Sequence, residues 1–466
     1  MKDAIVVGAG IAGLSAAWRL RRRNILVLEA DPRVGGRVQS QRRGPYWLNW
    51  GGHVYAGANS ATGDLLRSVG VQSVPVPGML KGLAMNGKLF LDGRVETIPF
   101  RLPMSMNARM GIFRAGAKVR YAVRQYAKMV ERRPGEDFRV HQQRVYEFMN
   151  DKTFADFVGK LPDEADALFR PTVSRSSGTP EQVSAGAGVG YFNLVWSKGD
   201  GEGLTQNILG GPSTLTQTIA HAMGDKLMLN AQVQEVVHKA DSVVVRYEKD
   251  GVAHEAEARY AVLATQAPIT RKIAVDLDDS TKKALDVIKY GPYVSAAFLT
   301  NETEPQVWDN TYAVATPKRS FNVAFNMSNV VRDFEPFRQQ GSSFMTFSPA
   351  DLARALIHKT DKEILNIYLN DLDQIFTGFS SKVVEAGVDR WTLGLPYCFP
   401  GRAKLQPFLS RPHNRIYLAG DYLGTFYTET SIQTGYSAAV DILSHLGTET
   451  MPCDPPEIDW AAVKAG

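Results

Sequence analysis

The sequence is poor in cysteine. Only two of its 466 residues are cysteines, Cys398 and Cys453. Two thiols cannot build a disulfide framework or a four-ligand zinc site, and the eight histidines show no HExxH or comparable ligand spacing. We therefore expect no structural metal, and a reducing cytoplasm is the expected compartment.

Long hydrophobic runs are also missing. The longest apolar run near the start, residues 4–14, spans 11 residues, far short of the roughly 20 that a membrane-spanning helix needs. Three residues precede this run and no cleavage-site pattern follows it. The run is therefore interpreted as a buried strand and its continuation, not as a signal peptide.

Charge of one sign is not in large excess. The chain carries 53 basic and 48 acidic residues, a formal net charge of +5, which is too small and too diffuse to predict a nucleic-acid partner. Hydrophobic residues make up 44% and charged residues 22% of the chain, as in ordinary globular proteins. The length suggests two large domains or about three of ~150 residues each.

The first forty residues contain a dinucleotide-binding pattern. The apolar residues 4–7 predict a buried parallel strand, and Gly8, Gly10 and Gly13 follow with GxGxxG spacing before a helical stretch. A second apolar strand ends at Glu29, 21 residues after Gly8, where a carboxylate can accept hydrogen bonds from ribose hydroxyls. Glycine-rich turns can serve packing alone, but four features agree here, and the acid argues against a 2′-phosphate. The predicted cofactor-binding residues of this segment are Gly8, Gly10, Ile11, Ala12, Gly13, Glu29 and Ala30.

A second glycine pair identifies the nucleotide by resemblance. Residues 33–37 read RVGGR, which resembles the second FAD fingerprint of the flavin amine oxidase superfamily. That superfamily includes monoamine and polyamine oxidases, protoporphyrinogen oxidase and carotenoid-type desaturases. By this resemblance Gly35, Gly36 and Arg37 wrap the pyrophosphate, which suits a guanidinium. The alternative is a plain surface turn.

The C-terminal region resembles a further element of the same superfamily. Residues 415–421 (RIYLAGD) are followed by the stretch ETSIQTG and a small-residue helix. The resemblance implies that Asp421 holds the ribityl or pyrophosphate region. It also implies that a helix beginning near Ser431 points its N-terminus at flavin N1 and C2, where its dipole stabilises negative charge on the reduced flavin. Further cofactor-binding residues implied by the resemblance are Gly51, Gly52, Val236, Gly420 and Ile432.

The expected fold class is α/β. It comprises a discontinuous, doubly wound, three-layer FAD-binding domain of the Rossmann-like GR2 type and a mixed α/β substrate domain. Asn86-Gly87 predicts a hairpin turn, Ser213 a helix N-cap, and residues 232–237, 243–247 and 260–264 three strands. The expected FAD-binding segments are residues 1–75, 205–285 and 386–448. The expected substrate-domain segments are residues 76–204, largely helical, and 286–385, and residues 449–466 are expected to form a loose tail.

Aromatic residues near the C-terminus are candidates for the substrate site. Tyr427 occupies the place of one tyrosine of the amine oxidases' aromatic cage, which sandwiches an amine or a flat substrate against the flavin. Trp391 and Tyr397 are candidates for the opposite wall, and each of the three could instead be a core residue. Cys398 lies too close to Gly401 to match the cysteine that carries covalent flavin in monoamine oxidases, so we predict non-covalent FAD.

One departure from the amine oxidases bears on the chemistry. Most of them have a lysine that reaches flavin N5 through water and is tied to oxygen reactivity, and counting from Gly291 this position is Ser295. A neutral hydroxyl cannot supply that cation, which favours the branches that oxidise carbon–carbon bonds. His53, in a segment that resembles the loop by the flavin, is a candidate for a group near a substrate carbonyl, or it packs against the isoalloxazine edge.

Basic residues recur between positions 101 and 133, interleaved with Met106, Met110, Phe113 and Tyr121. This pattern indicates basic amphipathic helices. Three interpretations remain open: a solvated face, peripheral contact with an anionic membrane, or a funnel for a carboxylated substrate.

The sequence thus predicts an FAD-dependent oxidoreductase acting on a small molecule. The first expectation is CH–CH dehydrogenation of a cyclic substrate, as in protoporphyrinogen oxidase or cyclic-ketone desaturases. The alternatives are amine oxidation at CH–NH with oxygen as acceptor, and a non-redox isomerase or scaffold that binds FAD. The catalytic base, the electron acceptor and the oligomeric state are left open.

Overall fold

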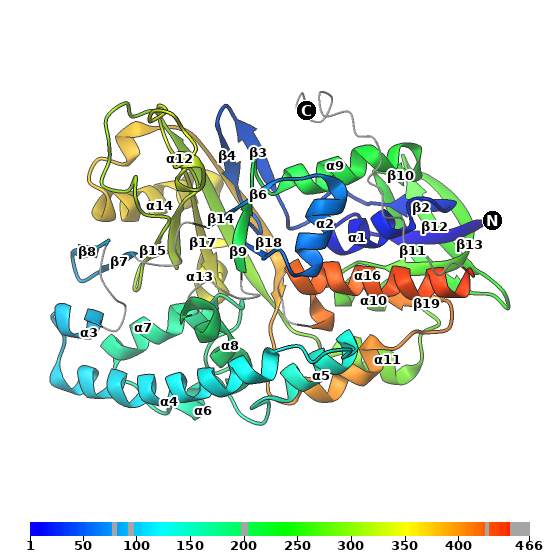
Figure 1. The fold of residues 1–466 in the computed structure, drawn as a ribbon, viewed down its shortest axis with the longest axis horizontal. Coiled ribbons are helices and arrows are strands. Elements are labelled where there is room, and N and C mark those ends of the chain that lie inside the picture. The colour runs from blue at the N-terminus through cyan, green and yellow to red at the C-terminus, as the bar shows by residue number, and fades with distance from the viewer. Residues whose placement is uncertain (77–81, 92–96, 197–203, 425–427, 448–466) are drawn as a thin grey trace.

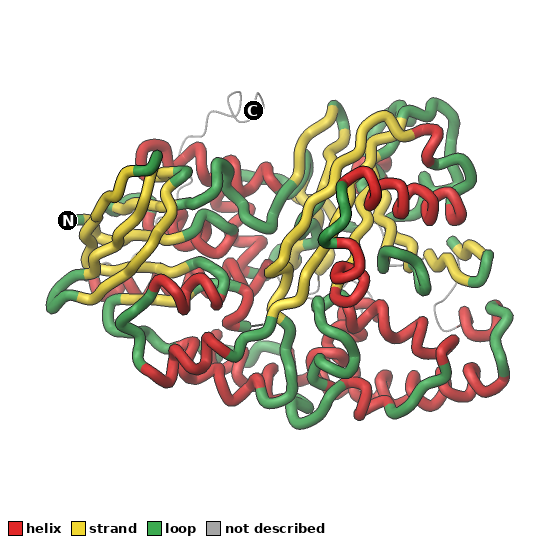
Figure 2. Tube along the Cα trace, turned by 180° about the vertical axis from the view of Figure 1, so that it is seen from behind, coloured by secondary structure: helices red, strands yellow, loops and turns green. Residues whose placement is uncertain are grey.

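The computed structural model describes residues 1–76, 82–91, 97–196, 204–424 and 428–447. Two large sheets lie side by side, and a group of helices runs beneath them (Figure 1). The first sheet contains the N-terminal strand, and the second lies at the opposite end of the long axis. The long strands of the second sheet cross the middle of the molecule (Figure 2).

The first sheet is mostly parallel. β1 pairs in parallel with β2 on one side and with β13 on the other, and β13 also pairs in parallel with β19. β11, β12 and the first half of β13 form an antiparallel meander. The strands are β1 (Lys2–Val7), β2 (Ile25–Leu28), β10 (Leu227–Met228), β11 (Ala231–His238), β12 (Val243–Lys249), β13 (Val252–Leu263) and β19 (Ile416–Leu418).

Both faces of this sheet are covered, because successive side chains of a strand point to opposite sides. Ala4 and Val6 of β1 join one core with helices, whereas Ile5 and Val7 join a second core. The helices of the first core are α1 (Ile11–Leu20), α2 (Ala61–Val69), α9 (Ser213–Met223) and α16 (Thr428–His445). The helices of the second core are α10 (Ala267–Ile273), α11 (Asp279–Asp286) and α15 (Gln406–Ser410), which lie beside the meander.

The second sheet is largely antiparallel. Its spatial order is β18, β14, β17, β16, β15, β7 and β8, with β15 and β7 in parallel. One face packs on α13 (Ala350–Leu356) and α14 (Asp361–Ile375). The strands are β7 (Gly82–Met85), β8 (Lys88–Phe90), β14 (Tyr290–Thr300), β15 (Ala313–Ala315), β16 (Val323–Asn326), β17 (Ser343–Pro349) and β18 (Val383–Pro396).

A layer of helices underlies both sheets (Figure 1). Its core is built mainly from α4, α7 and α8. The helices of the whole layer are α3 (Ile98–Arg101), α4 (Met106–Val130), α5 (Phe138–Glu147), α6 (Phe154–Val158), α7 (Asp163–Ser174) and α8 (Ala185–Trp196). The remaining elements are α12 (Asn329–Arg332), the hairpin of β3 (Ser40–Arg43) and β4 (Tyr46–Asn49), and the small sheet of β5 (Tyr55–Ala56), β9 (Leu204–Ile208) and β6 (Ser73–Pro75).

The α/β class with a doubly wound sheet and a mixed second domain is confirmed. The expected hairpin at Asn86-Gly87 is present between β7 and β8, with both residues at positive φ. The strand expected at residues 260–264 is the end of the longer β13. The segment boundaries expected at 204/205 and 385/386 fall inside β9 and β18, and the expected tail, 449–466, lies outside the described residues.

Ser213 is not the N-cap that the sequence predicts. Pro212 occupies that position, and Ser213 is the first residue of α9. Its backbone N–H donates to Ser40 Oγ at 2.9 Å, and its own Oγ accepts from Ser40 N–H at 2.8 Å. Ser213 therefore ties α9 to β3 through a reciprocal pair of hydrogen bonds.

Among the described residues, no helix is both long and apolar enough to cross a lipid bilayer.

Candidate active site

A cavity of about 680 Å³ lies between the two sheets. The turn after β1, the RVGGR segment and the start of α16 line one end, and strands β14, β16 and β17 of the second sheet line the other. Most of the residues predicted from sequence to bind the cofactor line this cavity: Gly8, Gly10, Ile11, Ala12, Glu29, Ala30, Gly35, Gly36, Arg37, Gly51, Gly52, Gly420, Asp421 and Ser431.

The three glycines of the first turn are needed for different reasons. Gly8 has φ +96°, and a Cβ there would lie 3.0 Å from the carbonyl oxygen of Ala264. A Cβ on Gly10 would meet nothing within 4 Å, so its backbone faces open space in the cavity. A Cβ on Gly13 would lie 1.9 Å from Gly8 O, so Gly13, which does not line the cavity, lets α1 approach the turn. No side chain caps the N-terminus of α1, which begins at this turn, and its amide groups are available to an anion.

The second glycine pair lies directly against the first turn. Gly35 N–H donates to Ala9 O at 2.9 Å, and Gly10 and Gly35 form a parallel bridge. Gly35 and Gly36 both have positive φ, +100° and +54°, which favours glycine. Two motifs that the sequence separates by more than twenty residues therefore build one cradle.

Glu29 lies at the cavity wall, at the end of β2. Its Oε2 accepts from Ala9 N–H at 2.6 Å, and its Oε1 accepts from Asp31 N–H at 3.0 Å. Burial raises the pKa of Glu29, although the two N–H donors oppose the rise. The Glu29 carboxylate therefore fixes the backbone of the glycine turn through Ala9, and Glu29 also lines the cavity.

Arg37 and Asp421 form an ion pair beside the cradle. Arg37 Nη1 lies 2.7 Å from Asp421 Oδ2 and also donates to Gly394 O at 2.7 Å. Burial opposes the charge of Arg37, but Asp421 outweighs it and raises the pKa of the guanidinium. Asp421 Oδ1 is buried and has no hydrogen-bond partner within the protein. An unpaired carboxylate oxygen in a cradle of open glycines fits a dinucleotide that carries hydroxyl donors.

The C-terminal helix closes this end of the cavity. α16 begins at Thr428, three residues before the predicted start, and Ser431 of its first turn lines the cavity. Glu429 accepts hydrogen bonds from Ala61 N–H at 2.8 Å and Thr62 N–H at 3.0 Å, so it caps α2. Ile432 does not line the cavity, because it is fully buried in the first core.

Aromatic rings line the other end of the cavity. His53 and Phe325 pack edge to face with ring centroids 4.6 Å apart, and Tyr312 and Phe347 lie within 5.8 Å of Phe325. Tyr293 in turn lies 5.4 Å from Phe347. Sequence reasoning missed these rings except His53, since they come from separate segments of the chain. Trp391, a predicted wall residue, also lines the cavity.

We call this aromatic end of the cavity the aromatic chamber. Two residues predicted from the sequence line it and carry polar atoms without hydrogen-bond partners. His53 Nε2 is buried without a hydrogen-bond partner, while Nδ1 lies 3.3 Å from Gly51 O. Burial lowers the pKa of His53 to about 4, and the charge of Arg175 adds to the effect, so the ring is neutral near pH 7. Ser295 on β14 is 1% exposed, lines the cavity, and its Oγ has no partner. Both residues line the cavity, and a polar group bound there would supply the partners that the two atoms lack.

Arg175 brings positive charge to the aromatic end. It follows α7, and its backbone carbonyl accepts a hydrogen bond of 2.5 Å from the hydroxyl of Tyr293. Arg175 lines the cavity, and its charge acts on the pKa of three rings of the aromatic end, His53, Tyr293 and Tyr312. The described carboxylates of the cavity lining, Glu29, Asp31 and Asp421, all belong to the glycine-rich end. No motif in the sequence marks Arg175.

Three further candidates, besides Gly13 and Ile432, are not part of the described cavity lining. Tyr397 packs in the helical core with Val183 and Phe192, because β18 ends one residue before it. Val236 is fully buried, whereas Val233 and Gln234 line the cavity beside a bulge in β11. Tyr427 lies outside the described residues.

Cys398 is buried away from the cavity lining, where its sulfur accepts from Ser184 Oγ at 3.4 Å. Among the residues that the structure describes, no group of three or more His, Cys, Asp or Glu side chains is arranged to hold a metal ion.

Comparison with curated proteins finds oxidases. An L-amino-acid oxidase of Sistrurus catenatus edwardsii is 22% identical over 484 residues, which cover 95% of this chain and 87% of that protein. The "Probable flavin-containing monoamine oxidase A" of Dictyostelium discoideum is 24% identical over 290 residues, which cover 58% of this chain and 59% of that protein.

Solved structures share the fold. A putrescine oxidase bound to putrescine has a TM-score of 0.75 at 18% sequence identity, with 95% of this chain and 99% of that chain covered. The cyclohexylamine oxidase from Brevibacterium oxydans IH-35A has a TM-score of 0.74 at 18% identity, with 96% and 99% covered. The family model described as flavin containing amine oxidoreductase matches residues 11–443. The chain therefore belongs to the flavin-containing amine oxidoreductases and is an FAD-dependent oxidoreductase.

Proposed function

We propose that this enzyme oxidises the CH–NH bond of a small, largely apolar amine. The observation that carries the proposal is the aromatic chamber that continues the glycine cradle into the second sheet. Aromatic faces hold an amine and its hydrocarbon part without fixing a single geometry. The relatives named as monoamine, L-amino-acid and cyclohexylamine oxidases support this choice over the carbon–carbon dehydrogenation expected from the sequence.

FAD supplies the acceptor for the hydride equivalent that leaves the substrate carbon. The residues of the chain bind and orient the substrate and FAD. Gly10 and Gly36 would leave room for the phosphates, Arg37 would balance their charge, and the unpaired Asp421 Oδ1 would accept a hydrogen bond from a hydroxyl of the bound group. We predict that FAD is held without a covalent bond, since Cys398 does not line the cavity.

The chamber favours the uncharged amine. Loss of a hydride from carbon requires a nitrogen lone pair, so the substrate nitrogen must give up its extra proton first. Burial away from water disfavours an ammonium, and the nearby positive charge of Arg175 disfavours it further. The neutral amine then loses a hydride from carbon and a proton from nitrogen, which leaves an imine.

The same charges select among amines. A second ammonium, as in a diamine, would meet Arg175 and no carboxylate among the described residues of the aromatic end. A carboxylate on the substrate would instead find a guanidinium partner. We infer that monoamines and amino acids with apolar side chains are accepted and that diamines are poor substrates.

A second candidate function has one observation in its favour. Ser295 stands, buried and unpaired, at the position where by resemblance most amine oxidases have a lysine. A hydroxyl provides no cation near the reaction centre, which suits dehydrogenation of a cyclic CH–CH substrate that does not depend on fast reaction with oxygen.

Anaerobic titration separates these possibilities. Purified holoenzyme is mixed with benzylamine, phenylalanine, putrescine and cyclohexanone, and the flavin absorbance near 450 nm is followed. We expect stoichiometric bleaching by benzylamine or phenylalanine and little by putrescine. Bleaching by cyclohexanone alone would select the second candidate, and no bleaching by either class would favour a non-redox role. Acid precipitation should release the flavin into the supernatant.

A further inference from the structure

One face of α4 exposes a stripe of large apolar side chains. Met106, Met110, Phe113 and Tyr121 are 73%, 63%, 52% and 66% exposed. With Ala117 they recur every three or four residues, so they share one face of the helix. Phe100, just before α4, extends the stripe, because its ring lies 5.4 Å from that of Phe113. We call these residues the α4 stripe.

The opposite face of α4 holds the helix to the protein. Ala108, Ala115, Val119 and Ala122 are buried, and the last three belong to the core shared with α7 and α8. The α4 stripe is therefore not needed to fold the helix. Scattered exposed apolar residues are common, but a contiguous row along a helix marks a contact surface.

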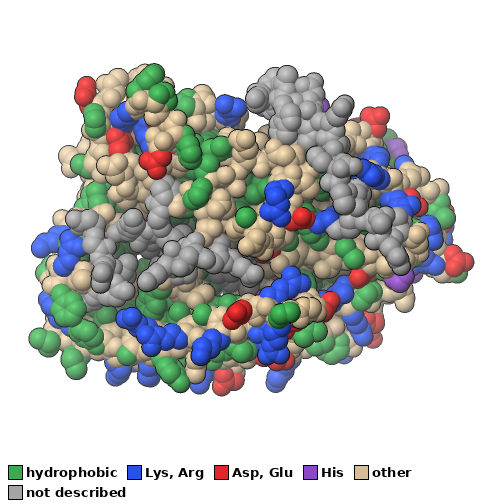
Figure 3. Space-filling model, in the orientation of Figure 1, with side chains coloured by type: hydrophobic (Ala, Val, Ile, Leu, Met, Phe, Trp, Pro, Cys, Tyr) green, Lys and Arg blue, Asp and Glu red, His purple; other side chains and the backbone are tan. Residues whose placement is uncertain are grey.

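Positive charge surrounds the α4 stripe. α4 carries Arg109, Arg114, Lys118, Arg120, Arg124 and Lys128 and no acidic residue. Three of these cations donate to backbone carbonyls, and the structure shows no ion pair for any of the six within its described residues. Hydrophobic side chains gather over the end of α4 next to α3, and Lys and Arg follow along the lower edge (Figure 3).

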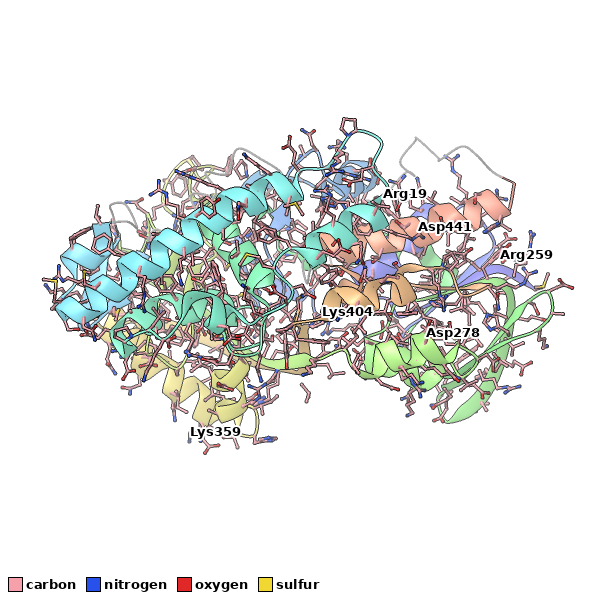
Figure 4. All side chains as sticks on the ribbon, turned by 90° about the horizontal axis from the view of Figure 1, so that it is seen from below. Arg19, Arg259, Asp278, Lys359, Lys404 and Asp441 are labelled. Carbon is pink, nitrogen blue, oxygen red and sulfur yellow. The ribbon has the colours of Figure 1, made fainter. Side chains whose placement is uncertain are left out.

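We propose that the α4 stripe docks on an anionic lipid membrane, with α4 lying in the plane of the interface. A helix with an apolar face bordered by cations sinks its apolar side chains about 5–10 Å into the boundary between headgroups and acyl chains. A second copy of the chain fits less well, because it would bring the same positively charged face against the first. α4 runs along the lower edge of the molecule in Figure 1 and lies at the surface in the view from below in Figure 4, so a flat surface can approach it.

The test uses holoenzyme and lipid vesicles. Vesicles of phosphatidylcholine alone and vesicles with 30% phosphatidylglycerol are sedimented with the protein at low and high salt. We expect binding to the anionic vesicles, weaker binding at high salt, and little binding to the neutral ones.

Two double variants separate the contributions of the apolar side chains and of the positive charges to vesicle binding. Met110→Ser with Phe113→Ser removes the centre of the α4 stripe, and Arg120→Gln with Arg124→Gln removes two cations. Since each basic residue near an anionic surface contributes about 1 kcal/mol, or roughly fivefold, the charge variant should lose about 25-fold in affinity. We expect the stripe variant to lose at least tenfold.

Matched controls alter similar residues elsewhere. Phe337→Ser removes a ring that is 70% exposed on the second-sheet lobe, and Lys359→Gln with Lys404→Gln removes two charges away from α4 (Figure 4). Both controls should bind vesicles as the unaltered protein does, and all variants should keep their flavin absorbance. Absence of binding to anionic vesicles, or equal binding by all variants, would overturn the proposal. A dimer that dissociates in the stripe variant without vesicle binding would assign the face to a second copy instead.

Discussion

Arg37 Nη1 and Asp421 Oδ2 lie 2.7 Å apart, although 384 residues separate them in the chain. The arginine belongs to the glycine pair that follows β2, and the aspartate follows β19. Their ion pair joins the first and last parts of the cofactor cradle. The other oxygen of Asp421 has no partner in the protein, so the same side chain can hold both Arg37 and a cofactor hydroxyl.

Asp421→Asn should weaken FAD binding. The amide loses the charge that balances Arg37, and hydrogen bonds to charged groups contribute about 1.5–3 kcal/mol. We expect the Kd of FAD to rise roughly 10- to 100-fold. Quenching of flavin fluorescence on titration of the apoprotein measures this value.

Asp441→Asn is the matched control. Asp441 pairs with Arg139 on the outer side of α16 and does not line the cavity (Figure 4). FAD affinity should be unchanged in this variant. An equal loss in both variants would show that Asp421 acts only through general stability.

Gly435→Ala should destabilise the protein. A Cβ at this position of α16 would lie 2.2 Å from Ala12 O, so the contact between α1 and α16 must open. We expect a loss of about 1–3 kcal/mol, as for overpacked cores, seen as a lower thermal midpoint and weaker FAD retention. Gly116→Ala in α4, where a Cβ meets nothing within 4 Å, should instead be neutral or gain up to ~1 kcal/mol. Equal effects would contradict the role of the close helix contact.

Arg175→Gln should change substrate preference. The Tyr293 hydroxyl bonds to the backbone carbonyl of Arg175, so this contact survives the substitution. We expect kcat/KM for carboxylated amines to fall roughly 10- to 100-fold, because a charged hydrogen bond of about 1.5–3 kcal/mol is lost, while values for monoamines hold or rise. Lys272→Gln, which removes a cation from the glycine-rich end of the cavity, should leave the ratio between the two classes unchanged. A fall for both classes in Arg175→Gln would contradict a role in selection.

His53 should contribute to loss of stability in acid. Burial lowers its pKa from 6.5 to about 4 in the folded protein, so the neutral ring favours folding above pH 6.5. Below that pH the unfolded chain takes up the proton first, and this stability is lost as pH falls toward 4. A shift of this size corresponds to about 3 kcal/mol.

Thermal midpoints of the unaltered protein and His53→Gln between pH 7 and pH 4 test the effect, and the variant should lose less stability on acidification. Burial also lowers the pKa of His413 to about 4, so the thermal midpoint of the variant should still fall somewhat as the pH is lowered. Parallel profiles for the two proteins would count against a buried neutral His53.

The cofactor end of the site could be predicted from sequence because its motifs are local. Gly8, Gly10 and Gly35 stand in short runs whose spacing reflects one turn each. The first run follows β1 directly, and the second lies between β2 and β3. Even there, the tertiary structure determines which individual residues reach the cavity. The bulge in β11 brings Val233 and Gln234 to the cavity instead of Val236, and no local pattern announces a bulge.

The substrate end could not be predicted because its residues share no segment. Arg175, Tyr312, Phe325 and Phe347 come from a helix end, the residue before a strand and two strands, and only the packing of the second sheet brings them together. Trp391 reaches the cavity from within β18, whereas Tyr397, just past its end, turns into the helical core. Periodicity places a side chain on a face of its element, but it does not say what that face meets.

The contact between α1 and α16 has a consequence during translation. Asp421 leaves the ribosome 384 residues after Arg37 of the second glycine turn, and α16 follows Asp421. Until α16 is made, the small-residue surface of α1 is not packed against another helix, and the nascent chain lacks part of the residues that bind the flavin. We therefore expect coenzyme loading to follow the synthesis of α16, and polypeptides released before α16 should accumulate as colourless, protease-sensitive fragments.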